Sequence, residues 1–389
     1  MSDLVTLDQL LVPDLLSGRH GRNRGRGLAQ IAAQDDRSAV LAWLARYADS
    51  PATLASYRKE AERLLLWCVR QHQVPLSDLS HEDLLVYQHF LGWPEPAERW
   101  VTASGQKPGR ASPAWRPFAG PLSLASQRQA LSILNGMFNW LVEAGYLAGN
   151  PLALSRRKAR TRAPRVSRFL PQEHWQEVKN SIEAMPVGTA REALHAARCR
   201  WLFSLLYVGG LRVTEVCTAT MGSLFMRRSG DGRERWWLEI TGKGDKTRLV
   251  PATEELVFEL VRYREAHGLP SLPTEGDSTP LLLPVIGSAK PMARTAVHEI
   301  VKGVMRNTAS RLRKLGPDFD ATATHIERAS THWLRHTAGT HLSDHVDIKL
   351  VRDNLGHSSI ATTSVYLHSE DDQRHDETSS VHRVLWRQT

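Results

Sequence analysis

The sequence has few cysteines, no long apolar run and no signal-like N-terminal stretch, the features that are typical of secreted and membrane proteins. It has only three cysteines in 389 residues, Cys68, Cys199 and Cys217. They lie far apart in apolar helical patterns, which indicates buried reduced thiols of a cytosolic protein and not a disulfide framework. No apolar run approaches the length of a membrane span. The N-terminal stretch MSDLVTLDQLL lacks a cationic start and a cleavable apolar core, so we expect no secretory signal and no membrane partner.

Acidic residues are also in deficit. The chain carries 50 lysines and arginines against 41 aspartates and glutamates, a net charge of +9. This excess predicts a polyanionic partner, most simply nucleic acid, although ribosomal and membrane-surface proteins share the bias. The hydrophobic content of 41% and charged content of 23% are ordinary for a soluble protein. The length is sufficient for two or three domains.

Residues 1–36 combine glycines with Arg19, Arg22, Arg24 and Arg26. This composition predicts a flexible basic N-terminal arm that is able to lie along phosphates. A disordered solvated tail is the alternative.

Residues 37–153 show helical spacing over most of their length. Helices are predicted from Ala39, after Pro51, after the N-cap Ser80 and in the stretch LSLASQRQALSILNGMFNWLVEAGYL. Residues 94–121 interrupt the pattern with six prolines, and we expect an irregular loop there with exposed Trp100 and Trp115. Four or five helices with short connections predict a small all-α domain.

Residues 154–169 contain no acid. Their seven basic residues are Arg156, Arg157, Lys158, Arg160, Arg162, Arg165 and Arg168. Such a run cannot form a core and repels itself, so it predicts an extended interdomain linker. A linker this basic also suits a chain that crosses a DNA duplex.

A second domain is predicted over 170–389. Its helices are expected at 171–184, 189–208, 254–267 and 296–315. Gly209-Gly210 ends one helix and Arg212 stands at the start of the next, where backbone N–H groups favour an anion. The stretch ERWWLEITGKGDKTRLVPA predicts a β-hairpin with Lys243 at its tip.

Residues 331–368 gather histidines, an arginine and a tyrosine. His332, Arg335 and His336 fall at i, i+3 and i+4 and share one helix face. His357 and Tyr366 follow, and a phosphodiester under attack needs such cations, imidazoles and a phenol. The pairs His332/His336 and His341/His345 leave a metal site as an alternative. That alternative is disfavoured because HWLRH lacks the glutamate of a zinc protease and holds an arginine.

Five motifs, GGLRVTEV, TGKGDKTRLVP, HWLRHTAGTHL, LGH and Tyr366, together resemble the successive boxes of the tyrosine recombinases, the phage integrase family. The match covers about 170–370, and 38–152 is loosely similar to the family's helical core-binding domain. The resemblance implies a mainly α fold: an all-α N-terminal domain, and a catalytic domain of α+β type with a small β-hairpin or sheet. Thr331 departs from the proline that is frequent in the family, and Gly339 from its alanine.

The resemblance also implies catalytic roles. The matching residues are Arg212, Lys243, His332, Arg335, His357 and Tyr366. Tyr366 would attack the phosphodiester, and Arg212 and Arg335 would hold its non-bridging oxygens. Lys243 would be the general acid, with Lys246 the nearby competitor. His332 would assist proton transfer and His357 would bind the phosphate, while Glu215 and His336 would support the site.

The implied activity is site-specific DNA recombination through a 3′-phosphotyrosyl intermediate and a Holliday junction, with no cofactor and no metal. The protein would be a monomer without DNA and a homotetramer on two duplex sites, in the bacterial cytoplasm with the nucleoid. The expected DNA contacts are Thr53, Tyr57, Arg58, Arg128, Arg156, Arg157, Lys158 and Lys246. The tail VHRVLWRQT is a candidate for docking into a neighbouring protomer. A non-catalytic DNA-binding relative and a type IB topoisomerase-like enzyme are the rival functions.

Overall fold

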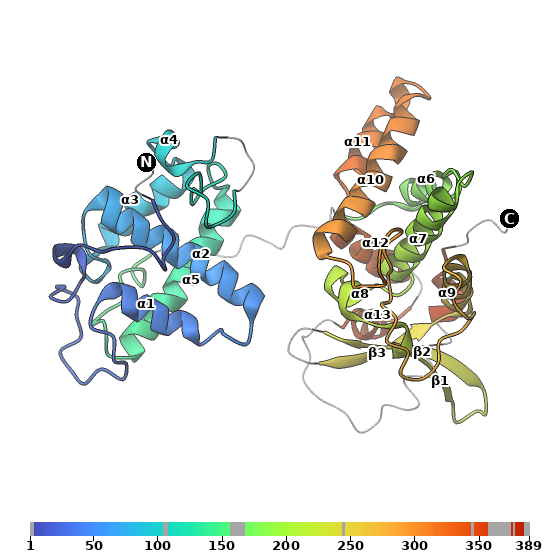
Figure 1. Ribbon diagram of the computed structural model, residues 1–389, viewed down its shortest axis with the longest axis horizontal. Helices are drawn as coiled ribbons and strands as arrows, with labels where there is room; N and C mark the ends of the chain where they lie inside the picture. Colours follow the sequence, from blue (N-terminus) through green and yellow to red (C-terminus); the bar gives the residue numbers. More distant parts are fainter. Residues whose placement is uncertain are drawn as a thin grey trace. The chain divides into compact units, whose positions relative to one another are not determined.

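The computed structural model describes residues 4–103, 108–155, 168–242, 246–343, 346–356, 375 and 378–384. The chain divides into two compact units, Met1–Thr161 and Arg162–Thr389, each with its own hydrophobic core. Helices dominate both units, and a small sheet lies in the second (Figure 1). The predicted fold class is therefore confirmed. Within the described ranges, none of the helices has both the length and the apolar character that a bilayer span needs.

The first unit is helical. Its helices are α1 (Asp36–Ala45), α2 (Pro51–Trp67), α3 (His81–Gly92), α4 (Ala97–Trp100) and α5 (Leu124–Glu143). Pro51 occupies the first turn of α2, where its missing N–H costs no hydrogen bond. Ser80 is the N-cap of α3 as predicted, and its hydroxyl accepts a hydrogen bond from the Asp83 amide at 3.2 Å. Short turns at Asp14–Leu16, Cys68–His72 and Leu76–Asp78 connect these elements.

The prediction of a flexible arm over 1–36 is wrong for the residues that the structure describes. Leu7 is fully buried, and its amide donates to Glu62 at 2.6 Å. The Arg24 guanidinium lies 3.9 Å from the centre of the Tyr146 ring. Leu4, Leu7 and Leu10 join the core of the helical unit, because the burial of their apolar surface outweighs the basic character of the glycine-rich stretch that follows.

The prediction that Trp100 and Trp115 are exposed in the irregular segment 94–121 is also wrong. Trp100 is fully buried and Trp115 is 9% exposed, so neither ring faces solvent. Trp100 meets Phe90 edge-on at 5.0 Å, and Arg110 lies over Trp115 at 5.6 Å. The prolines make the backbone irregular, but the aromatic side chains still contribute to the core.

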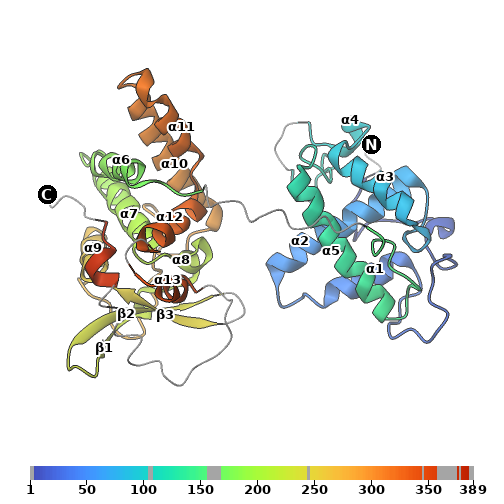
Figure 2. The same ribbon diagram turned by 180° about the vertical axis from the view of Figure 1, so that it is seen from behind.

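The second unit holds the remaining elements. They are α6 (Gln172–Glu183), α7 (Ala190–Tyr207), α8 (Val213–Thr218), β1 (Leu224–Arg228), β2 (Glu234–Thr241), β3 (Thr247–Ala252), α9 (Glu254–Ala266), α10 (Arg294–Arg313), α11 (Asp320–Arg328), α12 (Thr331–Ser343) and α13 (Ile348–Leu355). Short 3-10 turns lie at Met221–Ser223 and Pro317–Phe319. Figures 1 and 2 show α10 and α11 side by side, extending beyond the rest of the unit.

The three strands form one antiparallel sheet in the order β1-β2-β3. The predicted hairpin is β2 and β3, whose register pairs Thr241 with Thr247 next to the turn. The first strand was missed, since FMRR carries little alternation of apolar and polar residues. The hairpin delivers Arg248 to the site described below, whereas Lys243 lies outside the described residues.

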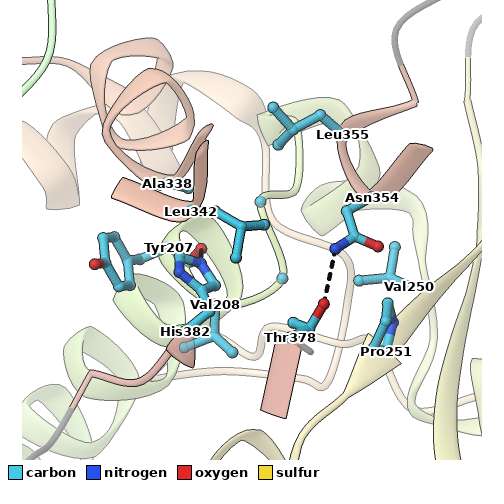
Figure 3. A pocket seen from close by; sticks show the side chains of 12 residues that line it. Tyr207, Val208, Val250, Pro251, Ala338, Leu342, Asn354, Leu355, Thr378 and His382 are labelled. Atoms are coloured by element: carbon cyan, nitrogen blue, oxygen red, sulfur yellow. Dashed lines mark hydrogen bonds between the residues drawn. The ribbon is translucent and has the colours of Figure 1, made fainter. Parts of the chain in front are cut away.

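The C-terminal segment packs on its own unit. The His382 ring stacks on Tyr207 at 4.6 Å, and its Nε2 lies 2.6 Å from the Tyr207 carbonyl oxygen. Figure 3 shows Thr378 and His382 among side chains from α7, α12, α13 and β3, with the Asn354 amide donating to the Thr378 hydroxyl at 2.9 Å. Val384 is fully buried. The described part of VHRVLWRQT is thus held within this chain.

The three cysteines are free and buried, as predicted. Burial raises the pKa of Cys68 and of Cys199, the latter to about 12. The thiols therefore stay protonated and serve as small apolar core residues.

Asp36 gives the first unit a testable pH dependence. Its carboxylate is 1% exposed and accepts hydrogen bonds from the Ser77 amide and the Tyr146 hydroxyl, at 3.0 and 2.8 Å. Burial outweighs these bonds and raises the pKa from 3.8 to about 6. Because the protonated form is favoured in the folded state, this stabilisation is complete below pH 4 and is lost as the pH rises through 6.

We therefore expect the opening free energy of α1 to fall by about 3 kcal/mol between pH 3 and pH 8. Native-state hydrogen exchange of α1 in the full chain, corrected for intrinsic rates, measures it. The Asp36→Asn variant should lack this component. An equal pH dependence in both proteins would contradict the assignment.

Candidate active site

A tight turn between α7 and α8 positions Arg212. Gly210 has a φ of +56°, and a Cβ there would lie 2.7 Å from a methyl group of Leu355. Only glycine fits this backbone conformation and this packing without strain. The turn makes Arg212 the N-cap of α8, as predicted, with its amide donating to Glu215 Oε2 at 2.7 Å.

Glu215 is a buried carboxylate between two arginines. It is 2% exposed and accepts from Arg212 Nη1 at 2.8 Å. Arg248, on β3, donates to it through both Nη atoms, each at 2.8 Å. Burial alone would raise the pKa of Glu215, but the hydrogen bonds and charges of Arg248 and Arg212 outweigh it and lower the pKa to about 2. Glu215 is thus a permanent anion that holds two cations in place.

Arg335 lies on α12 and is 4% exposed. Its Nη1 donates to the Gly210 carbonyl and its Nη2 to the Leu355 carbonyl. Burial, followed by repulsion from Arg212 and Arg248, lowers its pKa to about 9. The group is still charged at pH 7, so the site contains three guanidinium groups around one carboxylate.

The end of α13 is fastened to these guanidinium groups. Arg212 Nη2 donates to the Gly356 carbonyl at 3.0 Å, and Arg248 Nε donates to the Asn354 carbonyl at 3.3 Å. Gly356 has a φ of +60°, and a Cβ there would lie 2.7 Å from Arg248 Cδ. This turn leads directly to position 357, and His357 itself lies outside the described residues.

Two histidines stand one turn apart on the exposed side of α12. His332 Nε2 and His336 Nε2 are 3.0 Å apart, so one ring donates and the other accepts. Burial lowers the pKa of both, and the charge of Arg335 adds to the effect. Both rings are therefore neutral at pH 7, and the described residues hold no third ligand that would make the pair a metal site.

Arg212, His332 and Arg335 line an open cleft of about 420 Å³. Its walls come from the start of α8, the start of α12 and the first turn of α10. The lining residues are Leu211, Arg212, Val213, Thr214, Arg294, Thr295, His298, Thr331, His332 and Arg335. No acidic side chain is among them, so the cleft suits an anion.

The structure thus brings together five predicted residues from two segments that lie more than 100 positions apart in the sequence. They are Arg212, Glu215, His332, Arg335 and His336. Lys243, His357 and Tyr366 lie outside the described residues. Lys246 is exposed beside the hairpin turn, and its carbonyl accepts from the Gly242 amide at 2.9 Å.

The predicted DNA contacts of the first unit are partly engaged within it. Tyr57 stacks on Trp43 at 5.3 Å, and Arg58 pairs with Asp8 at 2.7 Å. The Thr53 hydroxyl lies 2.9 Å from the Ser50 hydroxyl, while Arg128 is exposed. The remaining residues of that prediction, Arg156, Arg157 and Lys158, lie outside the described residues.

Sequence reasoning missed Arg248, Arg294 and His298. Arg248 could have been anticipated, because a buried carboxylate beside Arg212 requires more than one cation. Arg294 and His298 gave no local signal, since their place in the cleft depends on how α10 packs.

Known proteins are similar to this chain in sequence and in fold. The family model described as "Phage integrase family" matches residues 177–373, about half of the chain. The chain belongs to the phage integrase family, the tyrosine recombinases. Tyrosine recombinase XerC of Mycobacterium sp. (strain KMS) is 31% identical over 233 residues, which cover 59% of this chain and 67% of the relative.

Two further relatives extend over more of the chain. Tyrosine recombinase XerD of Yersinia pestis is 28% identical over 317 residues, which cover 81% of this chain and 86% of the relative. The solved structure of the XerH site-specific recombinase bound to palindromic difH substrate, a post-cleavage complex, has a TM-score of 0.53 at 18% identity. That match covers 98% of this chain and 99% of the XerH chain, and it supports the same fold.

Glu215 offers a direct test of the site's electrostatics. Because its folded-state pKa lies below its unfolded value of 4.5, its ionisation stabilises the fold above pH 4.5, and this is lost as the pH falls through 2. We expect Glu215→Gln to lower the free energy of unfolding at pH 7 by about 3 kcal/mol, with a smaller loss toward pH 2. Urea unfolding across this range measures the difference.

The matched control is Glu275→Gln, which removes the same charge from an exposed position of the same unit. It should change the unfolding free energy little at any pH. Equal effects of the two substitutions would refute the bridging role of Glu215.

Proposed function

We propose that this protein is a site-specific DNA recombinase that cleaves and rejoins duplex DNA through a 3′-phosphotyrosyl intermediate. The observation that carries the proposal is the acid-free cleft beside Arg212, His332 and Arg335, with Glu215 as the buried counter-ion. Three guanidinium groups around one carboxylate leave unbalanced positive charge, which a phosphodiester would neutralise.

Arg212 and Arg335 would hold the two non-bridging oxygens of the scissile phosphate. Each Nη atom carries two hydrogens, so a bond to Glu215 or to a backbone carbonyl leaves another available. The Arg212 side chain is 37% exposed, and Arg335 also lines the cleft. Since both guanidiniums are fixed before substrate arrives, they can stabilise the pentavalent transition state with little reorganisation.

Tyr366 would be the nucleophile, a role that rests on the family resemblance. Its phenolic oxygen attacks phosphorus, the bond to the 5′ oxygen breaks, and the DNA 3′ end becomes linked to the tyrosine. Lys243 would give its proton to the leaving 5′ oxygen, and His357 would hydrogen-bond the phosphate. One phosphodiester replaces another, so rejoining requires neither ATP nor a metal.

His332 would move a proton between Tyr366 and the phosphate. Its lowered pKa keeps it neutral at pH 7, and a neutral ring can accept the phenolic proton. His336 would position His332, because the hydrogen bond between their Nε2 atoms holds the His332 ring in one orientation.

The DNA-level organisation is also proposed from the family. Residues 37–153 would form the core-binding domain, 154–169 a basic linker, and 170–389 the catalytic domain. Four copies on two duplex sites would exchange strands through a Holliday junction, with monomers in the absence of DNA. The protein would act in the bacterial cytoplasm with the nucleoid. Among the predicted DNA contacts of the first unit that the structure describes, Arg128 is the exposed one.

A nicked suicide duplex tests the chemistry. The wild-type protein should form a covalent adduct that persists on a denaturing gel, because the short strand beside the cleaved bond diffuses away. Tyr366→Phe should bind the duplex and form no adduct, whereas Tyr47→Phe should react like the wild type. Binding without an adduct in the wild type would indicate a non-catalytic relative. Supercoil relaxation without strand exchange would indicate a topoisomerase.

The pH dependence of adduct formation tests His332. The rate should fall as the pH drops through a value below 6.5, because protonated His332 cannot accept the tyrosine proton. His332→Gln should lower the rate near pH 7 by about 100-fold and remove this acid limb. An unchanged acid limb in the variant would exclude His332 as the titrating group.

A further inference from the structure

The cleft extends past the predicted catalytic residues onto α10. Arg294, Thr295 and His298 form this part of its wall, which we call the α10 wall. All three side chains are exposed, and none matches a motif of the family resemblance. The cleft therefore offers more cationic surface than a single phosphate would use.

Arg294 carries no counter-ion among the residues that the structure describes. The acid nearest to it along the outer face of α10, Glu299, lies 3.5 Å from Arg306 and so pairs with another arginine. Arg212, by contrast, pairs with Glu215 at 2.8 Å. An arginine that faces a cleft without acids keeps its full capacity for an external anion.

The α10 wall is fixed relative to His332. Val297 and Val301 are fully buried and anchor the first turns of α10 in the core, which places Arg294 and His298 on the adjacent face. The Thr331 hydroxyl lies 3.3 Å from His298 Nδ1 and links α10 to the start of α12. Thr331 is the position where the family frequently has proline, and a proline could not make this contact.

We propose that Arg294 binds a second phosphate of the DNA backbone, next to the phosphodiester held by Arg212 and Arg335. This inference rests on the proposed function. It assigns the part of the cleft beside α10 to the phosphate that neighbours the scissile one on the cleaved strand. One phosphate on each side of His332 would fix the direction of the strand and align the scissile bond. Arg294 is thus a positioning residue that takes no part in proton transfer.

Salt dependence of duplex binding tests the proposal without knowledge of the target site. The probe is a 30-base-pair duplex of arbitrary sequence, titrated with the full chain at several salt concentrations. Removing one phosphate contact should reduce the slope of log K against log salt by about one. Arg294→Gln should show this reduction and bind about fivefold to tenfold more weakly near 0.1 M salt, while Arg294→Lys should keep the slope.

Arg306→Gln is the matched control, because it removes the same charge from the same helix outside the cleft. Its slope should equal that of the wild type. An unchanged slope in Arg294→Gln, or equal reductions in both variants, would overturn the proposal. Thermal unfolding of each variant confirms that it is folded. Failure of the recombinase function would appear separately, as a wild-type protein that binds duplex and forms no adduct.

Discussion

The site depends on one buried charge, the carboxylate of Glu215. Without it, Arg212, Arg248 and Arg335 would repel one another, and the charge of Arg335, which is 4% exposed, would be poorly screened by water. With it, two guanidiniums are held at 2.8 Å, and Arg335 is left with a pKa of about 9. The folded protein therefore contains a positive charge that is only partly compensated, and the adjoining cleft is where an anion can complete the balance.

Close backbone packing makes this charge arrangement possible. Carbonyl groups of Gly210, Leu355 and Gly356 accept hydrogen bonds from Arg335 and Arg212, so the α7–α8 turn and the end of α13 are joined through the arginines. Gly339 belongs to the same contact, since a Cβ there would lie 2.9 Å from a methyl group of Leu355. The departure from alanine at position 339 thus accompanies tight packing of α12 on α13.

Sequence reasoning predicted correctly those features that depend on residue type and local spacing. The five motifs taken together, including the double glycine before Arg212 and the i, i+3, i+4 pattern around Arg335, led to the predicted site through their resemblance to the family, and helical periodicity predicted most helices. It failed for residues whose burial or contacts depend on the packing of elements distant in the sequence. The N-terminal leucines were assigned to a flexible arm because of the glycines and arginines that follow them, and Trp100 and Trp115 to an exposed loop because of its prolines. Arg248 and Arg294 acquire their roles only through contacts with distant elements.

The most direct test of the central claim is a crystal structure of the protein with a nicked duplex and vanadate, which mimics the pentavalent phosphorus. We predict vanadate in the cleft, with Arg212 and Arg335 donating to its equatorial oxygens and the Tyr366 oxygen in an apical position. Vanadate bound away from these arginines, or an ordered Tyr366 whose oxygen lies far from the vanadium atom, would contradict the account.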